Sequence, residues 1–87
     1  MMQQLQDFRE QLNELDDSLM KILEKRLGVC REIGEFKKSQ GLEIFDAARE
    51  EQIINSKIER SDLSPIFIGD LFRLIMNESK RLQGELK

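Results

Sequence analysis

One uninterrupted helical pattern occupies the N-terminal part of the chain, and it restricts the possible folds more than any other feature. Gly41 is the first residue that would end such a helix favourably, and Lys37 and Lys38 just before it suit the negative end of a helix dipole. The pattern therefore predicts a helix over residues 3–40, about 57 Å long at ~1.5 Å per residue. Its apolar residues follow steps of three and four without a proline: Leu5, Phe8, Leu12, Leu15, Leu19, Ile22, Leu23, Val29, Cys30 and Ile33.

Two shorter helices complete the predicted all-α fold. One covers residues 46–60 and begins at Asp46, a favourable N-cap; the other covers residues 64–86 and begins at Ser64–Pro65, a cap followed by proline. A compact chain of this length has a radius of gyration of only about 12 Å, so these helices cannot cover the long one. We expect a second chain to bury its apolar stripe, most simply in a two-fold dimer. A break near Gly28 or Gly34 is the alternative.

Composition supports one helical domain over residues 1–87. Only 39% of the residues are hydrophobic, 36% are charged, and Trp and Tyr are absent, so a sheet-rich fold is not expected. The net charge of −3 gives no general attraction to nucleic acid or to an anionic membrane. One cysteine excludes an internal disulfide, and neither a signal peptide nor a membrane span is recognisable. These features predict a soluble, cytoplasmic protein.

The chain has no histidine, which narrows the possible chemistry. A histidine general base, a His/Cys metal site and a Cys–His nucleophile are all excluded. An enzyme of this composition must act through binding, positioning and fixed charge, or through carboxylates and lysines.

Two cations lie on the apolar stripe of the long helix. Arg26 and Lys37 are eleven positions apart, which returns them to within about 20° of one direction, roughly 16 Å apart along the axis. Together they could hold a small dianion. Alternatively, each side chain could lay its stem over apolar surface and place its charge in water.

Ser79 and Gln83 raise a similar question in the third helix. They lie in line with an apolar stripe, although a buried polar group is costly unless it is hydrogen-bonded. We expect either another part of the protein or a ligand to satisfy them. The stripe consists of Leu71, Phe72, Ile75, Met76 and Leu82.

Arg9 points about 100° away from Arg26 and lies some 25 Å from it along the helix, so one chain cannot bring both to a single site. In an antiparallel dimer, however, the start of one long helix can reach the far end of the other.

In the second helix, Arg49 and Glu50 have the pattern of ordinary surface residues.

Five short motifs resemble the all-α, type II chorismate mutase family. They are FRE at 8–10, EKR at 24–26, IGEFKK at 33–38, DAARE at 46–50 and ESKRLQ at 78–83. The resemblance covers the chain from about residue 5 to residue 83. It implies a homodimer of intertwined three-helix chains with two active sites. It also implies an isomerase of phenylalanine and tyrosine biosynthesis that rearranges chorismate to prephenate without a cofactor or metal.

The resemblance also implies a role for each candidate residue. Arg26 and the partner subunit's Arg9 would bind the two carboxylates of chorismate, because guanidinium groups pair well with carboxylates. Lys37 would bridge a carboxylate and the ether oxygen, and Gln83 would be the second donor to that oxygen. The remaining residues would line the substrate: Ser79 beside a carboxylate, Glu50 as acceptor for the substrate hydroxyl, and Asp46 and Arg49 on the same wall.

Two alternatives stay open. An isochorismate–pyruvate lyase uses a similar fold and similar cations, although the residues at 46–50 resemble the mutases more. A non-catalytic helical dimerisation module would explain the long helix but not the inward polar residues. The sequence also allows an association with another enzyme of the aromatic pathway.

Overall fold

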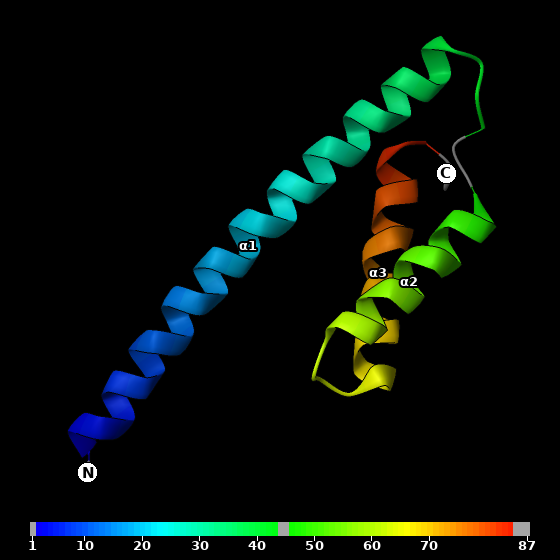
Figure 1. Ribbon diagram of the computed structural model, residues 1–87. Helices are drawn as coiled ribbons and strands as arrows, with labels where there is room; N and C mark the ends of the chain where they lie inside the picture. Colours follow the sequence, from blue (N-terminus) through cyan, green and yellow to red (C-terminus); the bar gives the residue numbers. More distant parts are fainter. Residues whose placement is uncertain (1, 44–45, 85–87) are drawn as a thin grey trace.

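The computed structural model describes residues 2–43 and 46–84, and within them it contains three helices and no strand. The helices are α1 (Met2–Ser39), α2 (Ala47–Arg60) and α3 (Pro65–Leu82) (Figure 1). The all-α prediction is therefore confirmed. The alternative of a broken first helix is wrong, because α1 continues through both Gly28 and Gly34.

The end of α1 follows the predicted stop signal. Gly41 adopts a positive φ of 68°, a conformation that glycine tolerates without strain. The Leu42 N–H donates to the Lys37 carbonyl at 2.8 Å, and the Gly41 N–H donates to the Lys38 carbonyl at 3.2 Å. These two bonds form a Schellman motif, which satisfies carbonyls that the helix leaves without partners.

Side-chain caps begin the other two helices, as predicted. Asp46 accepts a hydrogen bond from the Arg49 N–H at 3.0 Å, and Ser64 accepts one from the Phe67 N–H at 3.4 Å. The predicted end of the third helix at residue 86 is too late, because α3 ends at Leu82. Gly84 has a φ of 91° and stops the helix there, while residues 85–87 lie outside the described part of the chain.

The helices form an elongated molecule. α2 and α3 make a hairpin, and α3 also packs against the C-terminal half of α1 (Figure 1). The molecule measures 59 × 24 × 21 Å, and its radius of gyration is 16.7 Å. This value exceeds the roughly 12 Å of a compact chain of the same length, because the N-terminal half of α1 projects beyond the hairpin.

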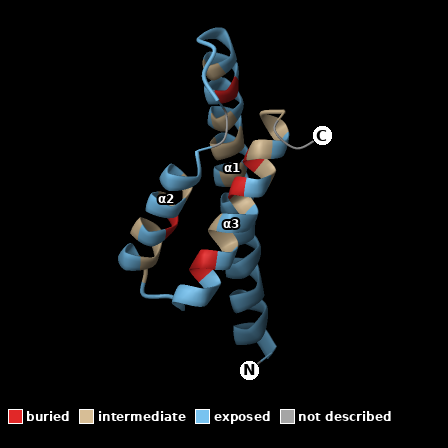
Figure 2. Ribbon diagram, turned by 90° about the vertical axis from the view of Figure 1, so that its right-hand side faces the viewer, coloured by how far each residue is buried: buried red, intermediate tan, exposed pale blue. Residues whose placement is uncertain are grey.

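The hydrophobic core of the single chain is small. Its buried apolar side chains are Ile54 of α2 and Ile68 and Met76 of α3, of which Ile54 is the least exposed at 2%. Figure 2 shows in red that each helix has only a few buried positions. Gly34 is the only residue of α1 that is buried. The core therefore lies within the hairpin and where α3 crosses α1.

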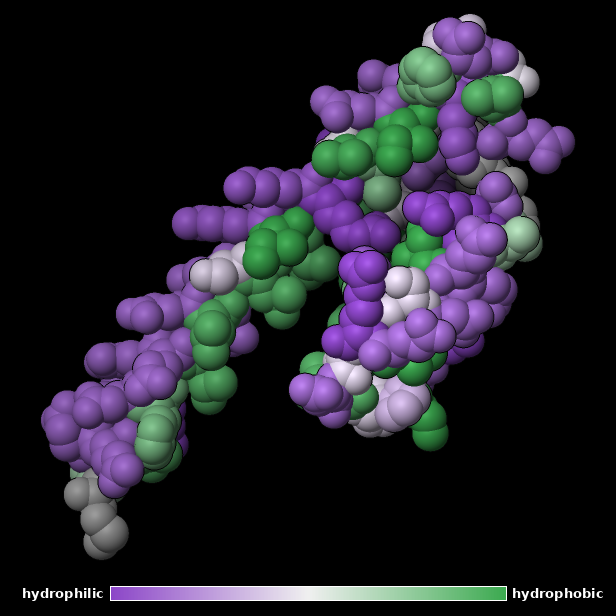
Figure 3. Space-filling model, viewed as in Figure 1, coloured by the Kyte–Doolittle hydropathy of each residue, from purple (hydrophilic) through white to green (hydrophobic). Residues whose placement is uncertain are grey.

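Most of the apolar stripe of α1 is uncovered in the single chain. Leu15, for example, keeps 64% of its surface exposed, and Figure 3 shows apolar side chains following one another along the helix. None of the described helices combines the length and the apolar character needed to cross a membrane. The other exposed members of the stripe are Leu5, Phe8, Leu12, Leu19, Ile22, Val29 and Ile33.

Gly34 allows α1 and α3 to approach closely. A Cβ atom at this position would lie 2.8 Å from Cγ and 3.1 Å from Cβ of Gln83. At Gly28, in contrast, an added Cβ atom would meet nothing within 4 Å. Gly34 is therefore a packing residue, and it determines how close Gln83 comes to α1.

The two glycines provide a matched test of this contact. Replacing either one by alanine favours the helix by about 0.5–1 kcal/mol, but only Gly34→Ala introduces a clash, which costs about 1–3 kcal/mol. We expect Gly34→Ala to have a lower free energy of unfolding than Gly28→Ala by about that clash cost. Urea denaturation of both variants measures the difference, and equal stabilities would contradict the close approach.

Candidate active site

A cavity of about 340 Å³ lies between the C-terminal half of α1, the start of α2 and the end of α3. Its size suits a small molecule. We call it the central cavity. It is lined by Arg26, Cys30, Ile33, Lys37, Asp46, Arg49, Glu50, Ile53, Met76, Ser79, Lys80 and Gln83. Every predicted site residue except Arg9 is among them.

Arg26 is directed toward α3 by Ser79. Its Nη1 donates to Ser79 Oγ at 3.5 Å and lies 3.7 Å from Cys30 Sγ. The Ser79 hydroxyl, whose residue is only 6% exposed, donates its own proton to the Ile75 carbonyl at 2.9 Å. Ser79 is thus satisfied within the protein, and its main effect in this structure is to orient the guanidinium.

Lys37 and Gln83 occupy the end of the cavity near the close contact of α1 with α3. Lys37 is half-buried on α1, on the same side of the helix as Arg26. Gln83 caps α3, and its backbone N–H donates to the Ser79 carbonyl at 3.0 Å. Arg26 and Lys37 therefore line one cavity, as their helical spacing indicated, and Ser79 and Gln83 line it too. Their roles toward a substrate stay predictions.

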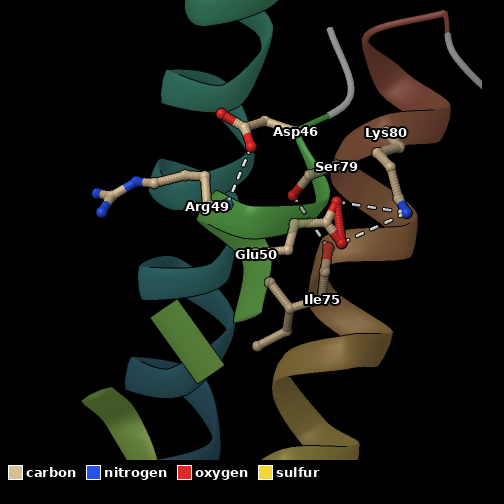
Figure 4. A network of polar contacts seen from close by, with 6 residues as sticks. All are labelled: Asp46, Arg49, Glu50, Ile75, Ser79 and Lys80. Carbon is tan, nitrogen blue, oxygen red and sulfur yellow. Dashed lines mark hydrogen bonds and ion pairs between the residues drawn. The ribbon is translucent and has the colours of Figure 1, made fainter. Parts of the chain in front are cut away.

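The start of α2 forms the opposite wall of the cavity (Figure 4). Asp46 holds the cap of α2, so its predicted structural role is confirmed. Glu50 forms an ion pair with Lys80 of α3, with 3.4 Å from Nζ to either carboxylate oxygen. The Arg49 side chain extends away from this pair (Figure 4).

Lys80 is the charged residue of the cavity that the sequence analysis missed. The signal was present, because Met76, Ser79, Lys80 and Gln83 follow the spacing of one helix face. Cys30, expected to be a small core residue, also lines the cavity. Both residues share a helix face with a predicted site residue, Cys30 with Arg26 and Lys80 with Gln83.

Arg9 does not reach the central cavity of its own chain. It is exposed on the projecting half of α1 and does not line the cavity. This position agrees with the prediction that one chain cannot bring Arg9 and Arg26 together. Whether Arg9 completes a site in a second chain stays a prediction.

The charges around the cavity favour an anion. Its described lining contains four cationic side chains and two carboxylates, which leaves two positive charges in excess. Among residues 2–43 and 46–84, no group of His, Cys, Asp or Glu side chains could hold a metal ion. The arrangement can therefore bind a small dianion through ion pairs and can offer it the amide of Gln83.

Together, the three-helix fold and the small cavity with its excess of cationic side chains describe an all-α protein with a candidate anion-binding site. More specifically, the chain belongs to the chorismate mutase type II family, whose model matches residues 8–84. The match includes every cationic and amide residue of the central cavity.

Three curated relatives extend this comparison. A 3-dehydroquinate dehydratase of Pyrobaculum aerophilum is 50% identical over 46 residues, which are 53% of this chain and 15% of that protein. The T-protein of Enterobacter agglomerans is 33% identical over 91% of this chain and 22% of its own length. A chorismate mutase of Methanocaldococcus jannaschii is 23% identical over 98% of this chain and 89% of its own length. The chain thus spans less than a quarter of the length of the first two relatives.

The two roles considered for Asp46 can be separated by substitution. Asp46→Ala removes the cap and should lower the free energy of unfolding by about 0.5–2 kcal/mol, whereas Asp46→Asn keeps a capping oxygen and should change it little. Thermal or urea unfolding measures both. If Asp46→Asn were as unstable as Asp46→Ala, the charge of Asp46 rather than its hydrogen bond would hold the helix.

Proposed function

We propose that this chain catalyses the rearrangement of chorismate to prephenate. Membership of the chorismate mutase type II family supports this activity. The single observation that supports it in the structure is the central cavity. That cavity has an excess of two positive charges and includes Arg26, Lys37 and Gln83. Chorismate carries two carboxylates, so its charge matches the cavity. The proposal places the chain in phenylalanine and tyrosine biosynthesis.

The mechanism follows from what the reaction requires. The rearrangement is unimolecular, so the protein has to hold chorismate in the compact shape that brings the reacting carbons together. Arg26 would bind one carboxylate. Negative charge develops on the ether oxygen as its bond to carbon breaks, and Lys37 and Gln83 would donate hydrogen bonds to it. Such donors stabilise the transition state more than the substrate.

A direct assay tests this proposal. Purified protein is incubated with chorismate and, separately, with isochorismate. The disappearance of each substrate is followed by absorbance, and the products are identified by NMR. Formation of prephenate is the expected result. Release of pyruvate and salicylate from isochorismate would instead favour the lyase, and the absence of both activities in a folded protein would leave a dimerisation module.

We further propose that two chains form an intertwined homodimer in which the partner subunit's Arg9 completes each site. The exposed apolar stripe of α1 supports this assembly, because large exposed apolar surfaces mark interaction sites. The projecting half of α1 carries Arg9 beyond its own hairpin, where a second chain could receive it.

A cytoplasmic location and an association with another aromatic-pathway enzyme belong to the same proposal. The name of the P. aerophilum relative, a 3-dehydroquinate dehydratase, supports the association.

The role of Gln83 predicts a change in pH dependence. An amide donates a hydrogen bond at any ordinary pH, but a Glu side chain donates only when protonated. Gln83→Glu should therefore be active at acidic pH and lose activity as the pH rises through the pKa of the new carboxyl. Gln83→Ala should lose about 10²–10³ in kcat. Profiles of kcat against pH test this, with Gln52→Glu on exposed α2 surface as the control; a flat profile for Gln83→Glu would refute the donor role.

Sites shared between subunits predict complementation. When Arg9→Ala and Lys37→Ala chains are mixed, each heterodimer should contain one site with both residues intact. Random exchange should then restore about a quarter of the wild-type activity. Mixing Arg26→Ala with Lys37→Ala is the control, because both residues belong to the same chain's cavity and no intact site can form. Recovery in the control alone, or in neither mixture, would argue against the shared site.

A further inference from the structure

Lys80 and Glu50 form an ion pair within the wall of the central cavity. Both oxygens of Glu50 lie 3.4 Å from Lys80 Nζ, and the two side chains keep only 18% and 24% of their surfaces exposed, for Lys80 and Glu50 respectively. The pair joins α2 to α3 across thirty positions of sequence (Figure 4). It differs from the ion pairs Asp70–Arg73 and Glu78–Arg81, which join neighbours on α3 and are more exposed.

The position of the pair suggests more than a structural role. A carboxylate in the wall of a cavity repels a dianion that binds there, and Glu50 is such a carboxylate. The ammonium of Lys80 offsets that repulsion and also holds the carboxylate in one place. Without Lys80, the excess positive charge of the described lining would fall from two to one.

We propose that Lys80 is a positioning residue of the central cavity. By pairing with Glu50, Lys80 holds that carboxylate where the carboxylate can accept a hydrogen bond from the substrate hydroxyl. The ammonium group also reduces the repulsion between Glu50 and the substrate's carboxylates. The inference rests on the proposed mutase function. Lys80 acts through Glu50, so it differs from Arg26, Lys37 and Gln83, which are proposed to contact the substrate.

Removing the charge of Lys80 should weaken substrate binding more than it slows the reaction. The two carboxylates of chorismate keep their charges in the transition state, so the lost interaction with them should appear mainly in KM. For Lys80→Met, KM should rise about 10- to 100-fold, the range for one charge-assisted hydrogen bond, with a smaller change in kcat. Lys80→Arg should restore most of the loss because it keeps the cation.

A double-mutant cycle with Glu50→Gln separates positioning from direct contact. If Lys80 acts through Glu50, then adding Lys80→Met to Glu50→Gln should raise KM by less than about threefold. An equal 10- to 100-fold rise in both backgrounds would overturn the inference, because Lys80 would then bind the substrate itself. Lys80→Gln provides a second neutral variant, and circular dichroism confirms that each variant is folded.

Arg81→Met is the matched control on the same helix. Arg81 pairs with Glu78 at 2.7 Å outside the central cavity, and its hydrogen bond lowers the pKa of Glu78. Breaking this exposed pair should leave KM unchanged. An active wild type whose KM does not change in Lys80→Met would contradict this inference alone, whereas a wild type that does not form prephenate would contradict the proposed function as well.

Discussion

The length of α1 is the constraint on which the rest of the structure depends. This helix contains 38 of the 87 residues, and the α2–α3 hairpin packs only on its C-terminal half. The buried Gly34 marks the place where α3 comes closest, and the central cavity lies beside this contact. The other half of α1 keeps its apolar stripe exposed and carries Arg9 away from the site. The length of α1 thus explains the small core of the single chain and the position of Arg9 far from the central cavity.

The cavity obtains its chemistry from rigid elements rather than from loops. Arg26 and Lys37 stand on one helix, Ser79 and Gln83 on another, and the Asp46 cap begins a third. Ser79 directs the guanidinium through a hydrogen bond, and Lys80 holds Glu50 across the helix hairpin. In the proposed mutase, charges fixed in this way would need little reorganisation when chorismate binds, and a reaction without a base or nucleophile would depend on such fixed charges.

Helical periodicity predicted most of the fold and several of the residues that line the central cavity. It correctly gave three helices, the stop at Gly41 and the shared face of Arg26 with Lys37, because these depend on local spacing. It placed the end of α3 too late, since Gly84 was not recognised as a stop. The Glu50–Lys80 pair and the contact of Gly34 with Gln83 were missed, because each joins residues that only tertiary packing brings together. The sequence left open whether a protein group or a ligand satisfies Ser79. One partner, the Ile75 carbonyl, lies four residues back on the same helix, and only the other, Arg26, depends on tertiary packing.

The claim that one chain builds only part of the active site is tested most directly by the mass of the active species. The protein is sedimented through a solution of chorismate, and the zone that consumes chorismate is followed by absorbance. We expect this zone to sediment with twice the mass of the chain, because in the proposed dimer a second copy covers the exposed stripe of α1 and supplies Arg9 to each site. A zone that consumes chorismate at the full rate with the mass of a single chain would contradict the shared site.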